Sequence, residues 1–234
     1  MKEITPDDVI TTFAREADSL DQALHTHHII GALLYKKTNT HSVTELTHAY
    51  CRWLKMTEQY VRQTAPMLAA AGAALRDGDD EDKTWSCAFL HYKEEEIDSK
   101  GNYGHEVWAT QGLQALNAPN DIMNAPEPWS MQEYKRFFVT NANQHPYAIL
   151  GAKGILEHLS ILNAPKLENA LRVSGIQNIE KALQFINSHG VLDIDHVQEG
   201  NARIRHINRT DKLAQIILGA YVTSGSYRAF LTSV

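Results

Sequence analysis

Two histidines and an aspartate stand at ligand spacing in the segment His189-Gly-Val-Leu-Asp193-Ile-Asp-His196. On a helix, steps of four and seven residues bring three side chains within roughly 60° of one another, so that they can meet at one point. Imidazole nitrogen and carboxylate oxygen without thiolate suit a first-row transition metal, iron or manganese before zinc. The same residues also fit a plainer arrangement, in which a helix ends at Gly190, Asp193 caps the next helix and His196 lies on the surface.

A second segment, His41-Ser-Val-Thr-Glu45-Leu-Thr-His48, repeats this spacing. Here Ser42 and the threonines beside it favour the start of a helix, and Glu45 then lies in the first turn, where the helix dipole stabilises an acid. We therefore interpret this segment as a solvated helix face.

A run of acids precedes a third histidine. Lys93-Glu94-Glu95-Glu96 is followed, after a short break, by Gly104-His105-Glu106-Val107-Trp108. Such a run usually forms a solvated helix face, but this one follows apolar residues, and its helix is expected to break just before the histidine. A broken helix lets a carboxylate and an imidazole turn inward together.

Glu157 lies among apolar neighbours in the segment from Ala152 to Leu159. An acid on an apolar helix face is costly unless it is paired or bound to a metal ion. Lys153, one turn earlier, would provide an ion pair. Both interpretations of Glu157 remain open at the level of sequence.

Helices must position these residues, because apolar side chains recur every three or four positions nearly throughout the chain and alternating strand patterns are absent. We expect an all-α bundle of roughly seven to ten helices that forms a single domain over residues 1–234. In the C-terminal part the pattern predicts helices near 146–162, 176–188, 193–206 and 211–231. Three prolines make 117–130 a connection.

Composition limits the classes of partner. The chain has 234 residues with 28 acidic and 22 basic side chains, a net charge of −6, and no run of Lys and Arg, so we expect no nucleic-acid binding. No apolar run approaches the roughly 20 residues of a membrane span. The acidic N-terminal stretch is unlike a signal peptide. Two cysteines do not make a disulfide framework, which favours the cytoplasm.

The order of these features resembles the haem-oxygenase-like diiron oxidases. An acidic helix leads to Gly-His-x-x-Trp, a glutamate follows about fifty residues later, and His-x3-Asp-x2-His comes about thirty residues after that. The wider superfamily includes TenA-type thiaminases, the oxidase of coenzyme PQQ synthesis and the chlamydial death-domain-associated protein. The resemblance covers roughly residues 25–210 and implies a TenA-like helical bundle.

The resemblance also implies a metal site and a function. The ligands of two ferrous ions (Fe2+) would be the following residues: Glu95, His105, Glu157, His189, Asp193 and His196. Register at the first carboxylate stays open among Glu94, Glu95, Glu96 and Asp98, because 97–103 intervene before His105. The implied activity is the oxidation of a small organic molecule by dioxygen. On family precedent this molecule bears a carboxylate, and the protein forms a homodimer.

Other functions are compatible with parts of the sequence. A metal-free TenA-like hydrolase of thiamin compounds would need a nucleophilic cysteine and a late carboxylate; Cys87 is available, but after residue 199 the one acid is Asp211. Haem binding through His25, His27 or His28 has little support, since a histidine-rich helix start is more typical of polar surface, and we expect no haem. A non-catalytic helical scaffold would have a filled interior.

Overall fold

The computed structural model describes residues 3–28, 30–34, 41–95 and 105–232, without the side chains of Glu95, Val191 and Leu192. Within these ranges the regular structure is helical and includes no strand, which confirms the predicted all-α class. Nine of the helices in the described part have seven or more residues, within the range expected from the sequence. The elements are α1 (Pro6–Thr26), α2 (Ile30–Leu34), α3 (Val43–Val61), α4 (Thr64–Leu75), α5 (Asp80–Glu95), α6 (His105–Ala115), α7 (Asn120–Met123), α8 (Trp129–Lys135), the π-helix η2 (Arg136–Thr140), α9 (Ala148–Arg172), α10 (Ile179–Ala182), α11 (Gln184–Ile204) and α12 (Thr210–Leu231).

Local sequence determines where two of the long helices begin. At α1 the side chain of Thr5 accepts a hydrogen bond from the backbone N–H of Asp8, and the Asp8 carboxylate accepts one from the backbone N–H of Thr5. Ser42 and Glu45 make the same reciprocal pair at the start of α3. Both pairs satisfy backbone donors that a helix start leaves without partners. The interpretation of the segment from 41 to 48 as a capped helix start is confirmed.

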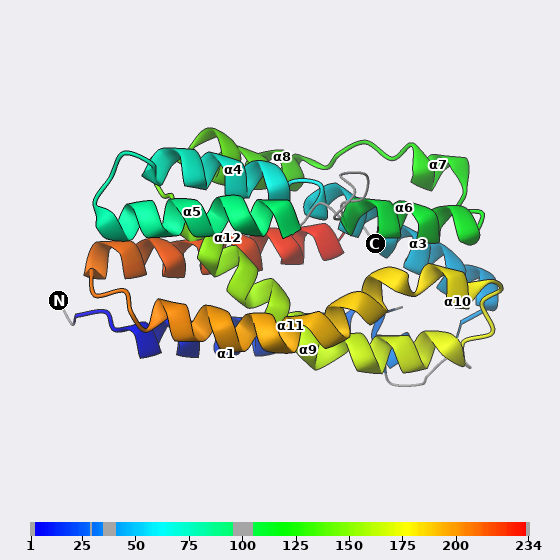
Figure 1. The fold of residues 1–234 in the computed structure, drawn as a ribbon. Helices are drawn as coiled ribbons and strands as arrows, with labels where there is room; N and C mark the ends of the chain where they lie inside the picture. Colours follow the sequence, from blue (N-terminus) through cyan, green and yellow to red (C-terminus); the bar gives the residue numbers. More distant parts are fainter. Residues whose placement is uncertain (1–2, 29, 35–40, 96–104, 233–234) are drawn as a thin grey trace.

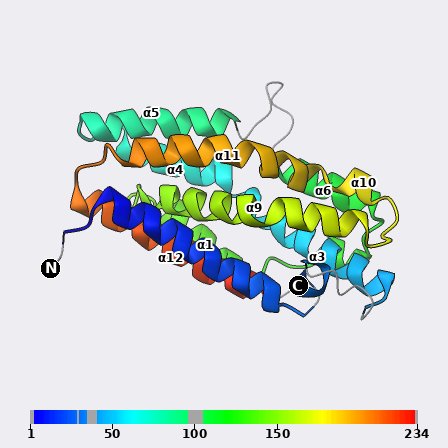
Figure 2. The same cartoon turned by 90° about the horizontal axis from the view of Figure 1, so that it is seen from below.

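Helix α9 lies at the centre of the arrangement. It packs against α11 on one side and against α12 and α1 on the other, while α4 pairs with α5 and α3 with α6 (Figure 1). Figure 2 shows α9 between α11 and the pair formed by α1 and α12. Residues of α9 can therefore reach the interior of the bundle from several sides.

Two glycines allow α9 and α12 to approach closely. A Cβ atom at Gly151 would overlap the backbone of Ile216, and one at Gly219 would overlap the backbone of Ala148. Any larger residue would push these helices apart. The close approach fixes the position of α9 against the C-terminal helix.

The structure corrects the predicted helix ends in the C-terminal part. Helix α9 continues past Pro165 to Arg172 rather than ending near residue 162. The helix predicted at 176–188 is divided between α10 and the start of α11, and α11 continues without a break through the helix predicted at 193–206. The plainer arrangement with a helix end at Gly190 is therefore wrong. The reason is tertiary: α11 packs along α9, with Gly190 beside Ala164, and burial between the two helices outweighs the weak helix preference of glycine.

Candidate metal centre

Helices α9 and α11 bring Glu157, Asp193 and His196 together. Each offers one ligand atom, and these atoms lie within 4.8 Å of one another. The Nδ1 atom of His196 is 3.5 Å from Oε1 of Glu157 and 3.7 Å from Oδ1 of Asp193. Because the two residues of α11 are three positions apart, they share a helix face, and that face meets Glu157 on α9.

One carboxylate oxygen of this cluster is buried and has no partner within the part of the chain that the structure describes. Asp193 is 4% exposed, and its Oδ2 atom accepts no hydrogen bond from the described residues. A buried carboxylate oxygen in this state destabilises a protein unless a cation or donor pairs with it. Two carboxylates and an imidazole, without thiolate, are donors that suit iron. The residues present therefore fit an iron ion.

The two carboxylates change the protonation of His196. Hydrogen bonds with Asp193 and Glu157 raise the pKa of His196 to about 9, against the opposing effect of burial. Without a metal ion, the imidazole therefore carries a proton at neutral pH. A metal ion that binds there must displace this proton.

Lys153 contacts the same cluster. Its Nζ atom lies 2.6 Å from Oε1 of Glu157, so the ion pair considered from the sequence is present. The ammonium group also lies 5.0 Å from the centre of the Tyr92 ring. The two readings of Glu157 do not exclude each other, since Glu157 contacts Lys153 and also belongs to the group with Asp193 and His196.

His105 and His189 form an adjacent pair. Their ring centres are 4.7 Å apart, at nearly perpendicular planes. Nδ1 of His189 donates to the backbone carbonyl of Phe185 at 2.8 Å, so in the neutral imidazole the lone pair is on Nε2. Burial lowers the pKa of His105, while the charge of Asp193 opposes this shift. His105 is therefore neutral at pH 7 and lies within the electrostatic influence of the carboxylate cluster.

The first carboxylate is not placed by the structure. Helix α5 ends at Glu95, whose side chain is outside the description, as are Glu96 and Asp98. Glu94 is described and is exposed. The assignment of the first carboxylate ligand among Glu94, Glu95, Glu96 and Asp98 stays a prediction.

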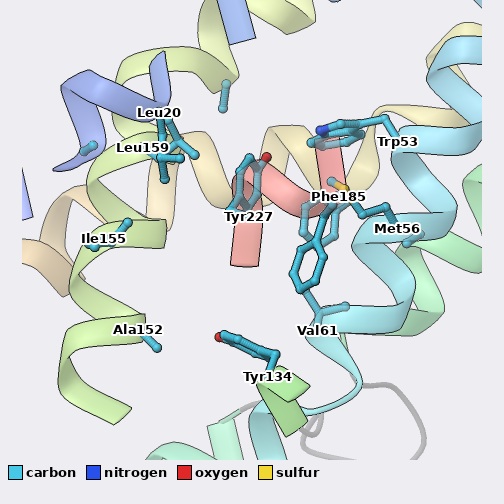
Figure 3. Close-up of a cluster of buried hydrophobic side chains, with 14 of the residues drawn as sticks. Leu20, Trp53, Met56, Val61, Tyr134, Ala152, Ile155, Leu159, Phe185 and Tyr227 are labelled. Carbon is cyan, nitrogen blue, oxygen red and sulfur yellow. The ribbon is translucent and has the colours of Figure 1, made fainter. Parts of the chain in front are cut away.

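A cavity of about 160 Å³ adjoins the candidate ligands. His105, Glu157, His189 and Asp193 contribute to its lining, together with Lys153. The rest is mainly apolar and aromatic. Figure 3 shows three helices contributing to this part of the interior through Ala152, Tyr134 and Phe185. These apolar and aromatic lining residues include Trp53, Tyr60, Tyr134, Leu156, Phe185 and Tyr227.

Sequence reasoning missed the tyrosines of this cavity. Tyr60, Tyr134 and Tyr227 come from α3, α8 and α12, so no local spacing relates them. Burial raises the pKa of each phenol, that of Tyr227 to about 12, and all three are neutral at pH 7. The one available signal was their position on apolar helix faces, which is equally typical of ordinary core residues.

The fold and the site can be compared with known proteins. Residues 51–225 match the model of a family described as iron-containing redox enzymes, and the chain belongs to that family. No curated protein matches the chain.

Solved structures share the fold. A domain of unknown function with a haem oxygenase-like fold from Shewanella denitrificans OS217 is similar with a TM-score of 0.74 and 14% identity, over 93% of this chain and 88% of that chain. A CADD-like protein of unknown function from Nostoc punctiforme PCC 73102 is similar in two crystal structures. Their TM-scores are 0.61 and 0.58, at 13% and 12% identity, over 94% of this chain in both and 95% and 93% of those chains. The predicted resemblance and the haem-oxygenase-like fold are confirmed.

Among the helices that the structure describes, none combines the length and apolar character that a membrane span requires.

Proposed function

We propose that this protein is a non-haem iron-dependent oxidase or oxygenase that uses dioxygen to oxidise a small organic molecule. The observation that carries the proposal is the buried Oδ2 of Asp193, beside Glu157 and His196 at the wall of a mainly apolar cavity. Among the described residues, this oxygen has no hydrogen-bond partner. Membership of a family of iron-containing redox enzymes supports it. We expect two ferrous ions and no haem.

Each candidate ligand has a part in this proposal. Glu157, Asp193 and His196 would hold one iron ion, and His105 and His189 would contribute to the second, with Glu95 or a neighbouring acid as its remaining carboxylate. Ferrous iron held there would supply electrons for the reduction of dioxygen. Glu157, at the meeting point of the two helices, is the carboxylate that we assign to both ions.

The remaining groups bind and orient the organic molecule. Apolar walls such as Leu156 and Phe185 exclude water from the reacting carbon. Lys153, which lines the cavity, supplies a positive charge that would attract a carboxylate-bearing molecule. The neutral His105 beside the cluster can bind metal without first losing a proton.

Metal analysis of protein loaded with ferrous iron under anaerobic conditions tests the proposal. We expect two irons per chain in the native protein. Glu157→Ala and His196→Ala should lose iron and abolish dioxygen consumption while helix content stays nearly unchanged, because metal ligands are kept for chemistry rather than stability.

His48→Ala is the matched control. His48 belongs to the other His-x3-acid-x2-His segment, at the capped start of α3, and should keep both iron content and dioxygen consumption. Full activity and full iron content in both ligand variants would refute the iron site.

The metal-free hydrolase receives no comparable support. Cys87 is exposed, Cys51 is buried, and burial raises the pKa of the Cys51 thiol to about 11, which makes it a weak nucleophile at neutral pH. Neither cysteine is among the described residues that line the cavity. A non-catalytic scaffold is disfavoured by the cavity itself, since such a protein needs no open space beside buried acids.

A further inference from the structure

A second buried polar group lines the same cavity. Asn163 lies on α9, six residues after Glu157, and is 6% exposed. Its Nδ2 group donates to the backbone carbonyl of Leu159 at 3.3 Å. Because a carbonyl oxygen only accepts hydrogen bonds, this contact fixes the orientation of the amide and makes the opposite atom, Oδ1, an acceptor.

The Oδ1 atom has no hydrogen-bond partner within the described ranges. An unpaired buried acceptor destabilises a folded protein, so a structure that retains one usually pairs it with something else. Of the lining residues nearest to Asn163 along α9, Leu159, Ala164 and Leu167 have apolar side chains, and the hydroxyl of Ser160 makes no hydrogen bond to Oδ1. Because no described residue supplies it, we look for the missing donor in the contents of the cavity.

We propose that Asn163 is a specificity-determining residue that accepts a hydrogen bond from a hydroxyl or N–H group of the molecule bound in the cavity. At about 1.5 Å per residue, Asn163 lies about 9 Å along α9 from Glu157. The ligand is therefore a largely apolar molecule with its donor group about 9 Å from the candidate metal ligands. As a statement about the substrate, this inference rests on the function proposed above; as a statement about binding, it can be tested separately.

The test compares two probes of nearly equal size, phenol and toluene, which differ by a hydroxyl in place of a methyl group. Isothermal titration calorimetry on the full chain, without added iron, gives the dissociation constant of each probe. The preference for phenol over toluene, taken as the ratio of these constants within one protein, cancels changes in cavity size to a first approximation.

We expect this preference to fall about tenfold in Asn163→Leu, because the variant removes the acceptor from an apolar site. Asn163→Ala removes the same acceptor without adding bulk, and should show the same fall even if the leucine variant packs poorly. Ser160→Ala is the matched control: Ser160 lines the cavity one turn earlier on α9, and its loss should leave the preference unchanged.

Three results would overturn the inference. The first is an unchanged preference in both Asn163 variants, as expected if an ordered water molecule satisfies Oδ1. The second is a loss of preference in Ser160→Ala, which would assign the contact to the hydroxyl. The third is the absence of binding of either probe to the native protein. Since no iron is present, failure of the iron site would leave the phenol preference intact, and the two proposals can fail independently.

Discussion

At the scale of single residues, Glu157 takes part in both the ion pair with Lys153 and the candidate metal site. Its Oε1 atom lies 2.6 Å from the Lys153 ammonium and 3.5 Å from Nδ1 of His196. A metal ion bound to Glu157 would meet the positive charge of Lys153 at the same oxygen. Without a metal, that ammonium balances the buried carboxylates, so Lys153 stabilises the metal-free protein and opposes metal binding.

The substitution Lys153→Met tests this dual effect. It should lower the free energy of unfolding of metal-free protein by about 1–3 kcal/mol, because Glu157 loses its cation, and raise ferrous iron affinity about tenfold. Urea unfolding and anaerobic iron titration measure the two quantities.

Lys166→Met is the control for that substitution. Lys166 also lies on α9, but its contact with Asp21 is at 3.9 Å and its side chain is half exposed, so both quantities should change little. Equal or weaker iron binding by Lys153→Met would mean that the ammonium does not compete with the metal.

Part of the site could be predicted from the sequence. The helical period alone placed Asp193 and His196 on a common face, and the interval of four residues suggested the pair of Lys153 with Glu157. Asn163 could not be identified in this way, because its importance comes from an atom left without a partner, which depends on the packing of other helices around it.

At the scale of helices, the close approach of α9 and α12 holds the candidate ligand Glu157 in place. Gly219 touches the backbone of Ala148 at the start of α9, and a backbone atom cannot move aside as a flexible side chain can. The position of α9, and of every ligand and cavity residue on it, therefore depends on a glycine of another helix.

The substitution Gly219→Ala should destabilise the protein by about 3 kcal/mol, since the added methyl group overlaps backbone. Thermal or urea unfolding measures the change. Gly225→Ala, on the same helix with no atom within 4 Å of the added Cβ, should instead stabilise by about 0.5–1 kcal/mol through helix propensity. Equal effects of the two substitutions would show that the helices can separate at little cost.

Helix existence was easier to predict than helix continuity. Gly190 and Pro165 are residues that usually end or bend helices, and both lie inside long helices here. Burial between neighbouring helices outweighs the local preference, as the position of Gly190 on α11 beside Ala164 on α9 illustrates. This contact joins residues far apart in the chain, so no reading of the local sequence could reveal it.

At the scale of the whole molecule, a buried lysine connects the C-terminal helix to α5. Lys212 is 2% exposed, and its Nζ atom lies 2.8 Å from Asp82, 3.1 Å from Glu81 and 3.2 Å from Asp79. Tyr147, before α9, donates to the same Asp82 oxygen at 2.9 Å. Burial opposes ionisation of Asp82, but the hydrogen bonds from Lys212 and Tyr147 outweigh it and lower the Asp82 pKa.

Stability should therefore decrease in acid. Because folding lowers the Asp82 pKa, its ionised form stabilises the folded protein above the ordinary pKa near 3.9, and this contribution is lost as pH falls through the lower, folded value. Lys212→Met should cost about 3 kcal/mol at pH 7 and weaken the dependence below pH 4. Urea unfolding from pH 3 to pH 7 measures both effects.

Lys83→Met is the control at the same end of α5. Lys83 makes an exposed contact of 3.9 Å with Asp80, so its loss should leave both the stability and its pH dependence nearly unchanged. If Lys212→Met retained the full dependence of stability on acid, the groups that titrate would have to lie elsewhere in the protein.

The homodimer and the cytoplasmic location expected from the sequence analysis stay predictions.

The central position of α9 limits which insertions and deletions this helix can accept. Gly151, which contacts α12, and the cavity residues Glu157 and Asn163 follow one another on a single helix. Inserting one residue between Gly151 and Glu157 would turn everything beyond it by about 100° and move it by about 1.5 Å. Glu157 would move away from Asp193 and His196, and Asn163 would leave the cavity, in one event. We therefore expect that mutation in this segment is tolerated as replacement of residues, while insertions and deletions are confined to the connections between helices.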